Sequence, residues 1–138
     1  MEINPFDESY FDGGPGSIGY GSYTDSWIWA PMTEVILHLT SEIGPILDWG
    51  CAKGHLIHRL LGRGIDAVGV DVSEYALSQV HPDIVSRVRL IDGVQTRYRR
   101  GHFETVLSFE TLEHVLGDQI PLVVEEIRRV TKRWFFGT

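Results

Sequence analysis

Hydrophobic positions along the chain fall into two alternating patterns. Short runs in which most residues are apolar occur at residues 46–49, 67–71, 88–92, 103–109 and 133–137. Between these runs, apolar residues recur at intervals of three and four, which is the spacing of an α-helix with one buried face. Short apolar runs of this kind are typical of strands whose two faces are both covered. The pattern therefore predicts strands and helices in alternation.

The ends of the helical segments are marked by specific residues. Pro31 suits the first turn of a helix that the Gly-Pro pair at residues 44–45 would end, and Ser73 can cap a short helix. The predicted helices span residues 31–43, 56–61, 73–80, 112–115 and 121–131. This alternation predicts an α/β fold, in which a doubly wound, mainly parallel sheet of about five strands has helices on both faces.

Composition places the chain among ordinary globular domains. It has 138 residues, about one domain, with 43% hydrophobic and 22% charged residues. No apolar run reaches the ~18 residues that a membrane-spanning helix needs, and the acidic start does not resemble a signal peptide. Cys51 is the only cysteine, so no intramolecular disulfide can form. These features predict a cytoplasmic protein with no membrane partner.

Charge is distributed unevenly along the chain. The net charge is −7, and eight acidic residues but no Lys or Arg precede Lys53. A solvated acidic leader explains this asymmetry, and a preference for a cationic ligand is the alternative. Because nucleic acid binding requires clustered Lys and Arg, the acidic balance argues against a nucleic acid partner.

Residues 1–30 show no clean hydrophobic period. They contain five glycines together with several aromatic residues, among them Tyr20, Tyr23 and Trp27. A disordered linker is poor in aromatic residues, so this segment is predicted to dock on another surface. A lid over an active site and a leader that packs on its own domain both fit this composition. The chain therefore divides into this leader or lid and a domain at residues 31–138.

Three acidic residues lie at the ends of apolar strand runs. Because the carboxyl ends of parallel strands meet at one edge of a sheet, Asp48, Asp71 and Asp92 should lie at the same edge. Turn formation or helix capping would explain any one of them. Three acids at equivalent positions indicate a polar ligand that lies across the sheet edge.

The turn Gly50-Cys51-Ala52-Lys53-Gly54 after the first predicted strand restricts the identity of this ligand. It matches neither the G-x-G-x-x-G dinucleotide pattern nor the phosphate loop. Asp48, just before the turn, would repel a pyrophosphate and attract a cation. Asp71 follows 23 residues later, close to the spacing at which an acid meets ribose hydroxyls. The predicted ligand is a nucleoside with a positive group, which argues against a nicotinamide-dependent oxidoreductase.

Four segments, in this order, resemble a known family. Residues 47–54 and 68–73 resemble the first two motifs of class I S-adenosylmethionine-dependent methyltransferases. Residues 103–115 and 125–130 are similar to the fourth strand and the following helix of the small-molecule methyltransferases. The resemblance covers residues 46–138. It implies a Rossmann-like fold, S-adenosylmethionine as the cofactor, and an enzyme that transfers a methyl group to a small-molecule acceptor.

Members of this class usually have seven strands, whereas the strands predicted here end with the fifth. We therefore expect a domain without the C-terminal strands of the family. The open edge of the fifth strand would then favour a homodimer. The alternative function is a non-catalytic S-adenosylmethionine-binding module, or a fragment that a partner chain completes.

The resemblance also implies which residues hold the cofactor. These residues are Asp48, Gly50, Cys51, Gly54, Asp71, Val72, Asp92, Gly93, Ser108 and Phe109. Asp71 would accept hydrogen bonds from the ribose hydroxyls, and Asp92 would lie at the adenine amino group. Ala52 replaces the commonest glycine of the first motif, which the loop accommodates if Ala52 keeps a negative φ. Glu104 replaces the usual Asp, as a surface change.

Glu110 and His114 are the candidate catalytic residues. They are four residues apart, so in a helix they would share a face, and at the mouth of the site His114 would act as a general base. A residue that bonds locally at the start of a helix is the alternative for His114. His55 and His58 have a spacing that metal ligands can have, but without a third ligand nearby we predict no metal.

Overall fold

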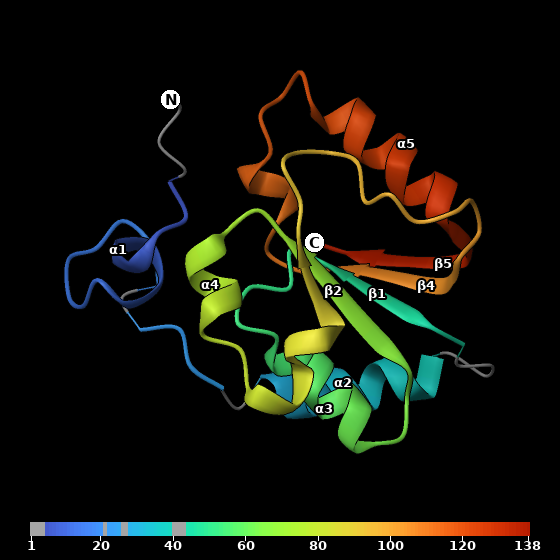
Figure 1. Ribbon diagram of the computed structural model, residues 1–138, viewed down its shortest axis with the longest axis horizontal. Coiled ribbons are helices and arrows are strands. Elements are labelled where there is room, and N and C mark those ends of the chain that lie inside the picture. Colours follow the sequence, from blue (N-terminus) through green and yellow to red (C-terminus); the bar gives the residue numbers. More distant parts are fainter. Residues whose placement is uncertain (1–4, 21, 26–27, 40–43) are drawn as a thin grey trace.

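Five parallel strands form the centre of the molecule (Figure 1). The structure is a computed structural model, and it describes residues 5–20, 22–25, 28–39 and 44–138. The strand order is β3-β2-β1-β4-β5, and every pairing between neighbours is parallel. The strands are β1 (Ile46–Trp49), β2 (Ala67–Asp71), β3 (Val88–Leu90), β4 (Phe103–Ser108) and β5 (Thr131–Gly137).

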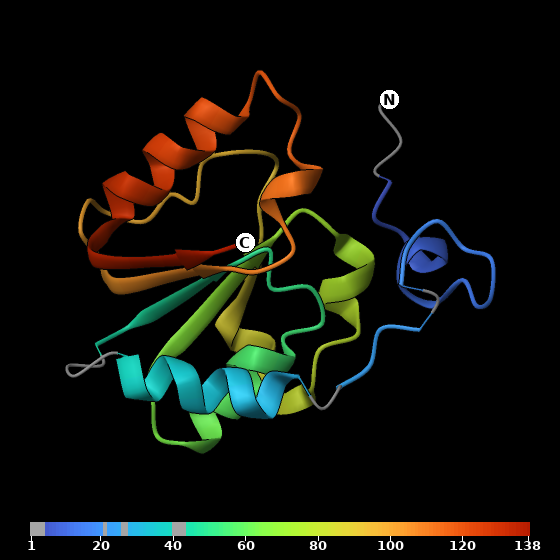
Figure 2. The same cartoon turned by 180° about the vertical axis from the view of Figure 1, so that it is seen from behind.

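Helices cover both faces of this sheet (Figures 1 and 2). Helices α2 (Trp29–Leu39) and α3 (His55–Gly62) lie against one face, and α5 (Ile120–Val130) lies against the other. The shorter elements are α1 (Glu8–Asp12), α4 (Glu74–Ser78) and two 3-10 helices, η1 (Pro82–Arg87) and η2 (Leu112–His114). The predicted fold class, a doubly wound α/β sheet of about five strands, is confirmed. In the described part of the chain, no helix has the length and apolar character needed to cross a membrane.

Alternate residues of the central strands supply the two hydrophobic cores. Ile46 of β1 and Leu107 of β4 pack on the α3 side, where Ile57 is fully buried. The neighbouring residues Leu47 and Val106 pack on the α5 side. Because successive side chains of a strand point to opposite faces, a strand covered on both sides must be apolar at nearly every position. This is why the apolar runs in the sequence are continuous.

The strand order also creates the crevice in which a ligand can bind. From β1 the chain continues outward through β2 and β3, and it then crosses back to β4 and β5 on the other side of β1. The connection after β1 leads into α3 on one face, whereas the connection after β4 leads to α5 on the other face. In such folds the ligand binds between these diverging loops, at the carboxyl ends of the strands.

Some elements differ from those that the sequence pattern predicts. The third strand has only three residues, and the start of the predicted fourth helix is the short 3-10 helix η2. The leader contains α1, which periodicity did not predict. This helix depends on a local cap, because the Asp7 carboxylate accepts hydrogen bonds from the backbone N–H groups of Ser9 and Tyr10. Residues 40–43 of the first predicted helix lie outside the described residues.

Several acidic residues of the N-terminal segment pair with the basic residues that follow β1. The pairs are Asp12–Lys53, Asp25–Arg59 and Glu34–Arg63. Lys53 lies in the loop after β1, Arg59 lies in α3, and Arg63 caps the end of that helix. These acids therefore have partners within the chain, which accounts for part of the charge asymmetry without a cationic ligand.

Strand β5 forms one edge of the sheet. Within the described part of the chain it pairs with β4 and with no strand on its outer side. The side chain of Phe135 is 44% exposed there, whereas Phe136 packs against the core. The leader does not cover this edge, because it lies at the opposite side of the molecule beside α4 (Figures 1 and 2).

We expect the open edge of β5 to pair with a second copy of the chain. Light scattering should then give a molar mass that rises with concentration toward twice the chain mass of 15.6 kDa. Phe135→Lys should shift this rise to higher concentration, because it places a charge at the edge. Val85→Lys, at an exposed apolar residue of η1, is the matched control. A constant monomer mass at all concentrations would contradict the expectation.

Candidate active site

A cavity of about 920 Å³ opens at the carboxyl edge of the sheet, between the leader and the loops that follow the strands. Its volume lies in the range of small-molecule and cofactor sites, roughly 300–1,000 Å³. Eight predicted site residues line it: Gly50, Asp71, Val72, Asp92, Gly93, Phe109, Glu110 and His114. The other four predicted residues are buried and do not line the cavity: Asp48, Cys51, Gly54 and Ser108.

The loop after β1 requires glycine at its first position. Gly50 has a φ of 81°, and a Cβ atom there would lie only 2.3 Å from the hydroxyl oxygen of Thr111. Thr111 belongs to the segment that follows β4, so the two loops at the crevice meet at Gly50. A side chain at this position would conflict with the left-handed backbone and with the neighbouring loop.

Ala52 adopts a left-handed backbone. Its φ is 47°, so the expectation that it keeps a negative φ is wrong. This conformation costs a non-glycine residue roughly 1–2 kcal/mol. The Ala52 N–H donates a 2.7 Å hydrogen bond to the Asp71 carboxylate, and its methyl group packs in a buried cluster with Phe11 of the leader. The sequence did not anticipate this conformation because it depends on a residue from β2 and another from the leader.

Asp71, the last residue of β2, connects three segments around the cavity. One carboxylate oxygen accepts from Ala52, and the other accepts from the Ser73 N–H at 2.8 Å. Burial raises the pKa of the Asp71 carboxyl, although the backbone hydrogen bonds oppose this effect. Backbone N–H groups of Ala52, Ser73 and Val72 thus act on this carboxylate. A carboxylate can accept about four hydrogen bonds, so part of its acceptor capacity remains. The ribose hydroxyls of a bound nucleoside would use that capacity.

Asp48 lies inside β1, beneath the loop that Gly50 begins. Its side chain is buried, and no hydrogen-bond donor among the described residues contacts its carboxylate. Burial, with a smaller contribution from the nearby Asp71 carboxylate, raises the pKa of Asp48 to about 7. A buried carboxylate without a counter-charge is costly, so a cationic group bound next to this loop would complement it. The amino or sulfonium group of S-adenosylmethionine has this charge.

The three predicted acids do not occupy equivalent positions. Asp48 pairs in register with Gly69, two residues before Asp71, and Asp71 itself pairs with Leu90 of β3. Asp92 lies beyond the end of β3 and is exposed at the cavity. The three acids thus range from buried in the sheet to exposed to solvent. The reason is that β1 ends at the register position of Val70, whereas β3 ends one position further on, at that of Asp71.

Contacts with two other segments dock the leader beside the cavity. The Asp12 carboxylate accepts from Lys53 Nζ at 2.5 Å and from the Tyr75 hydroxyl at 2.9 Å. The Ser73 hydroxyl donates to the Phe6 carbonyl oxygen at 2.5 Å. The leader is therefore bound both to the loop after β1 and to the N-terminus of α4.

Aromatic side chains of the leader form one wall of the cavity. The lining residues from this segment include Phe6, Tyr10, Phe11, Tyr20 and Tyr23. Most of their rings contact one another edge-on, whereas the Phe11 and Tyr20 rings are stacked. The centroids of the Tyr20 and Tyr23 rings lie 4.8 Å apart. Burial raises the pKa of Tyr20 to about 12, so its hydroxyl stays neutral. Trp27, which we had expected to join this wall, lies outside the described residues.

His114 is in direct contact with the leader. Its Nε2 lies 3.1 Å from the Tyr10 hydroxyl, and the Phe6 ring packs edge-on against its imidazole with centroids 5.7 Å apart. This contact between residues 104 positions apart was not visible in the sequence. The aromatic content of the leader was the one signal that pointed to it.

Glu110 and His114 do not share a helix face, as the sequence had suggested. Glu110 has a φ of 50° and precedes η2, which contains only Leu112–His114. The Glu110 carboxylate instead accepts from the Thr138 hydroxyl at 3.0 Å. A left-handed residue before the short 3-10 helix breaks the i, i+4 geometry, although both side chains line the same cavity.

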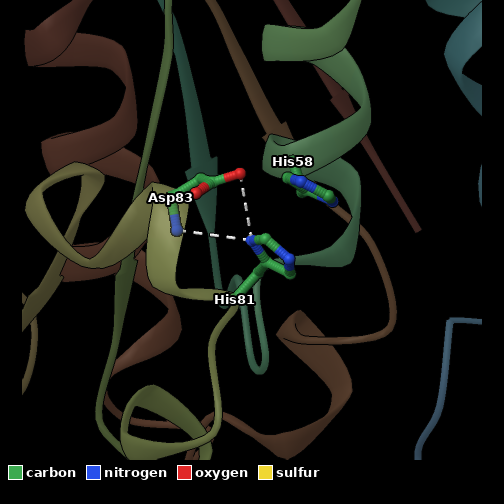
Figure 3. A group of neighbouring side chains, drawn as sticks. All are labelled: His58, His81 and Asp83. Atoms are coloured by element: carbon green, nitrogen blue, oxygen red, sulfur yellow. Dashed lines mark hydrogen bonds and ion pairs between the residues drawn. The ribbon is translucent and has the colours of Figure 1, made fainter.

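The histidines of α3 do not come together as a pair of ligands. The His55 ring stacks on Tyr23 with centroids 5.6 Å apart, whereas His58 faces His81, which precedes η1. In the part of the chain that the structure describes, His58, His81 and Asp83 form the group whose donor atoms lie close enough to hold a metal ion (Figure 3). This group lies outside the cavity.

Comparison with known families identifies the domain. A family model described as a methyltransferase domain matches residues 47–134, which is more than half of the chain. The chain therefore belongs to the methyltransferase domain family. The matched segment contains both motif loops, β4 and α5, so it coincides with the part of the sequence that carries the resemblance.

Solved structures agree with this fold. The protein PH0226 of Pyrococcus horikoshii OT3 matches with a TM-score of 0.70 and 22% identity, covering 92% of this chain and 59% of that one. A SAM-dependent methyltransferase of Archaeoglobus fulgidus matches with a TM-score of 0.68 and 17% identity, covering 80% of this chain and 49% of that one. A geranyl diphosphate methyltransferase, in complex with GPP and sinefungin, matches with a TM-score of 0.63 and 18% identity, covering 75% of this chain and 41% of that one. The chain thus spans about half the length of these structures. No curated protein sequence matches it.

These findings confirm the identification made from the motifs. The domain is a class I, S-adenosylmethionine-dependent methyltransferase domain with a Rossmann-like sheet, and S-adenosylmethionine is the cofactor of that class. The residues that would hold the cofactor in this chain fit it. The buried Asp48 carboxylate matches a cation, and Asp71 has acceptor positions left for ribose hydroxyls.

Replacing Asp48 by Asn should stabilise the domain at alkaline pH. The folded-state pKa of about 7 lies above the ordinary value of 3.8, so the wild-type domain loses stability as pH rises from about 4 to about 7. Asp48→Asn removes this cost. We expect a gain of about 4 kcal/mol in the free energy of unfolding at pH 8, and almost none at pH 4, where both side chains are neutral in the folded protein.

Urea unfolding of the cofactor-free protein at several pH values measures this difference. Asp66→Asn, at an exposed aspartate that pairs with Arg87, is the control, because it should give no gain at pH 8. A stability difference between Asp48→Asn and wild type that does not change with pH would show that Asp48 is already compensated in the folded protein.

Proposed function

We propose that this protein transfers a methyl group from S-adenosylmethionine to a small-molecule acceptor. The observation that carries the proposal is the cavity at the switch point of the sheet, where the buried Asp48 and Asp71 lie next to the loop after β1. When bound, S-adenosylmethionine supplies a methyl group on a positively charged sulfur. The chain has to bind this donor, position the acceptor in line with it, and exclude water.

Each cofactor-binding residue has a role that its position supports. Asp71 would accept from the two ribose hydroxyls, and Asp48 would attract the positive charge above the Gly50 loop. Asp92 and Phe109 line the cavity from the loops after β3 and β4, where they would contact the adenine ring. Cys51, Gly54 and Ser108 are buried behind this surface and would shape it.

The acceptor would lie between η2 and the leader. His114 lines this part of the cavity, and its Nδ1, the ring nitrogen that does not contact Tyr10, would take a proton from an O or N nucleophile as the methyl group is transferred. The Tyr10 hydroxyl would orient the imidazole. The aromatic wall of the leader would exclude water from the reaction, which is the role of a lid.

Two observations support a small acceptor. The leader lines one side of the cavity with aromatic rings, which suits a compact substrate better than a macromolecule. One structural neighbour is a geranyl diphosphate methyltransferase, a small-molecule enzyme by its name. A cytoplasmic setting is consistent with the single, buried free thiol of Cys51.

Asp71→Ala should weaken S-adenosylmethionine binding at least tenfold. The variant loses charge-assisted hydrogen bonds to two ribose hydroxyls, each worth roughly 1.5–3 kcal/mol. Titration calorimetry with S-adenosylmethionine measures the affinity, and circular dichroism confirms the fold. Asp118→Ala, at an exposed aspartate between η2 and α5, is the control. Unchanged affinity in a folded Asp71→Ala protein would rule out the proposed cofactor site.

Turnover distinguishes the enzyme from the alternative of a binding module. The protein is incubated with S-adenosylmethionine and fractions of a metabolite extract, and formation of S-adenosylhomocysteine is followed. Tight cofactor binding without turnover in any fraction would favour a non-catalytic module, or a unit that a partner chain completes.

Tyr10→Phe should lower kcat several-fold with little effect on stability or cofactor affinity. The variant keeps the ring that packs in the leader but removes the hydroxyl that contacts His114. Tyr20→Phe is the matched control, because it removes a neighbouring hydroxyl of the same wall. A pH–rate profile separates the roles, since its acidic limb, where a general base becomes protonated, should move in Tyr10→Phe and stay fixed in Tyr20→Phe. Equal profiles in both variants and in wild type would contradict a positioning role for Tyr10.

A further inference from the structure

Three exposed side chains from two separate elements converge outside the cavity (Figure 3). His58 lies one turn into α3, His81 precedes η1, and Asp83 is in the first turn of η1. One donor atom from each, two imidazole nitrogens and a carboxylate oxygen, lie within 4.8 Å of one another. None of the three lines the cavity, so this cluster is independent of the proposed methyltransferase site.

The geometry brings the donor atoms to one side of the group. The two imidazole rings stack with centroids 4.3 Å apart and planes 20° from parallel. The Nδ1 atom of His81 lies 3.4 Å from the Asp83 carboxylate, and it also accepts a 3.3 Å hydrogen bond from the Asp83 N–H. In Figure 3 the Asp83 carboxylate and the two rings face a common space.

The backbones that carry these side chains are held together by the core. Gly54, at the start of α3, approaches Ile84 of η1 so closely that a Cβ atom would lie 2.5 Å from the Ile84 side chain. Ile84 is buried in the same core cluster as Leu56 and Ile57 of α3. Pro82 fixes the backbone directly after His81. The separation of the ligands is therefore set by packing, and only their exposed side-chain ends need to adjust.

We propose that His58, His81 and Asp83 form a surface site for a zinc ion, with water as the remaining ligand. Two imidazoles and one carboxylate suit Zn²⁺, whereas Mg²⁺ and Ca²⁺ prefer oxygen ligands alone. Zinc–ligand bonds of about 2.0–2.2 Å at tetrahedral angles place ligand atoms roughly 3.3–3.6 Å apart. Rotation of the exposed side chains would bring donor atoms now within 4.8 Å of one another to that distance. His81 would exchange its weak hydrogen bond from the Asp83 N–H for the metal.

Zinc at this site would connect α3 to η1. Helix α3 begins immediately after the loop that contains Gly50 and Ala52, so the ion would fix the base of that loop relative to the connection between β2 and β3. Because the site needs both elements in their folded positions, zinc should bind the folded chain in preference to the unfolded chain. The expected consequence is a higher melting temperature in zinc.

The test is a titration of the full chain with zinc alone, in competition with a chromophoric chelator, in the absence of S-adenosylmethionine. We expect one equivalent of zinc at micromolar affinity, and a rise in melting temperature on saturation. His58→Ala and His81→Ala should each weaken binding at least tenfold, and Asp83→Asn should weaken it less. His38→Ala, at an exposed histidine of α2, should have no effect.

Two results would overturn the proposal. One is the absence of zinc binding at a tenfold molar excess over micromolar protein. The other is a dissociation constant that is the same in His58→Ala, His81→Ala and His38→Ala, which would place the zinc at another group. Circular dichroism of the metal-free variants confirms that they fold. A titration of wild type with Co²⁺ gives a second readout, because the intensity of its visible absorption reports the coordination geometry of the bound ion.

Discussion

The buried carboxylate of Asp71 is the interaction on which the surroundings of the cavity depend. It fixes the loop after β1 through the Ala52 N–H and the N-terminus of α4 through the Ser73 N–H. Ser73 in turn caps α4 and holds the leader through the Phe6 carbonyl oxygen. Three segments that are distant in the sequence therefore meet at one strand end. A change at Asp71 alters the shape of the cavity as well as its charge.

In this arrangement the buried Asp48 carboxylate lowers the stability of the folded domain, and a bound cofactor would remove this loss. Asp48 and Asp71 are both buried, and the charge of Asp71 raises the cost of ionising Asp48. Hydrogen bonds compensate Asp71, but none of the described residues supplies a counter-charge to Asp48. A cationic ligand would stabilise the folded state by pairing with a group that otherwise destabilises it. The Asp48 carboxylate thus lowers the stability of the ligand-free domain and raises its affinity for a cationic ligand.

The leader is part of the domain and forms a wall of its cavity. Its acidic residues pair with basic residues of the β1–α3 segment, and its aromatic rings face the cavity beside His114. The same segment therefore contributes ion pairs that position it and side chains that shape the site. These contacts agree with packing on its own domain, whereas the interpretation of this segment as a lid stays a prediction.

The sequence by itself determined the sheet, the order of its elements and the loop after β1. Continuous apolar runs, helical spacing and the Asp48–Gly54 motif are local, and local patterns can be read from one chain. It did not determine the left-handed Ala52, the break between Glu110 and His114, the contact of Tyr10 with His114, or the group of His58, His81 and Asp83. Each of these depends on residues that only the folded sheet brings together, because packing sets the distance between elements that share no sequence period.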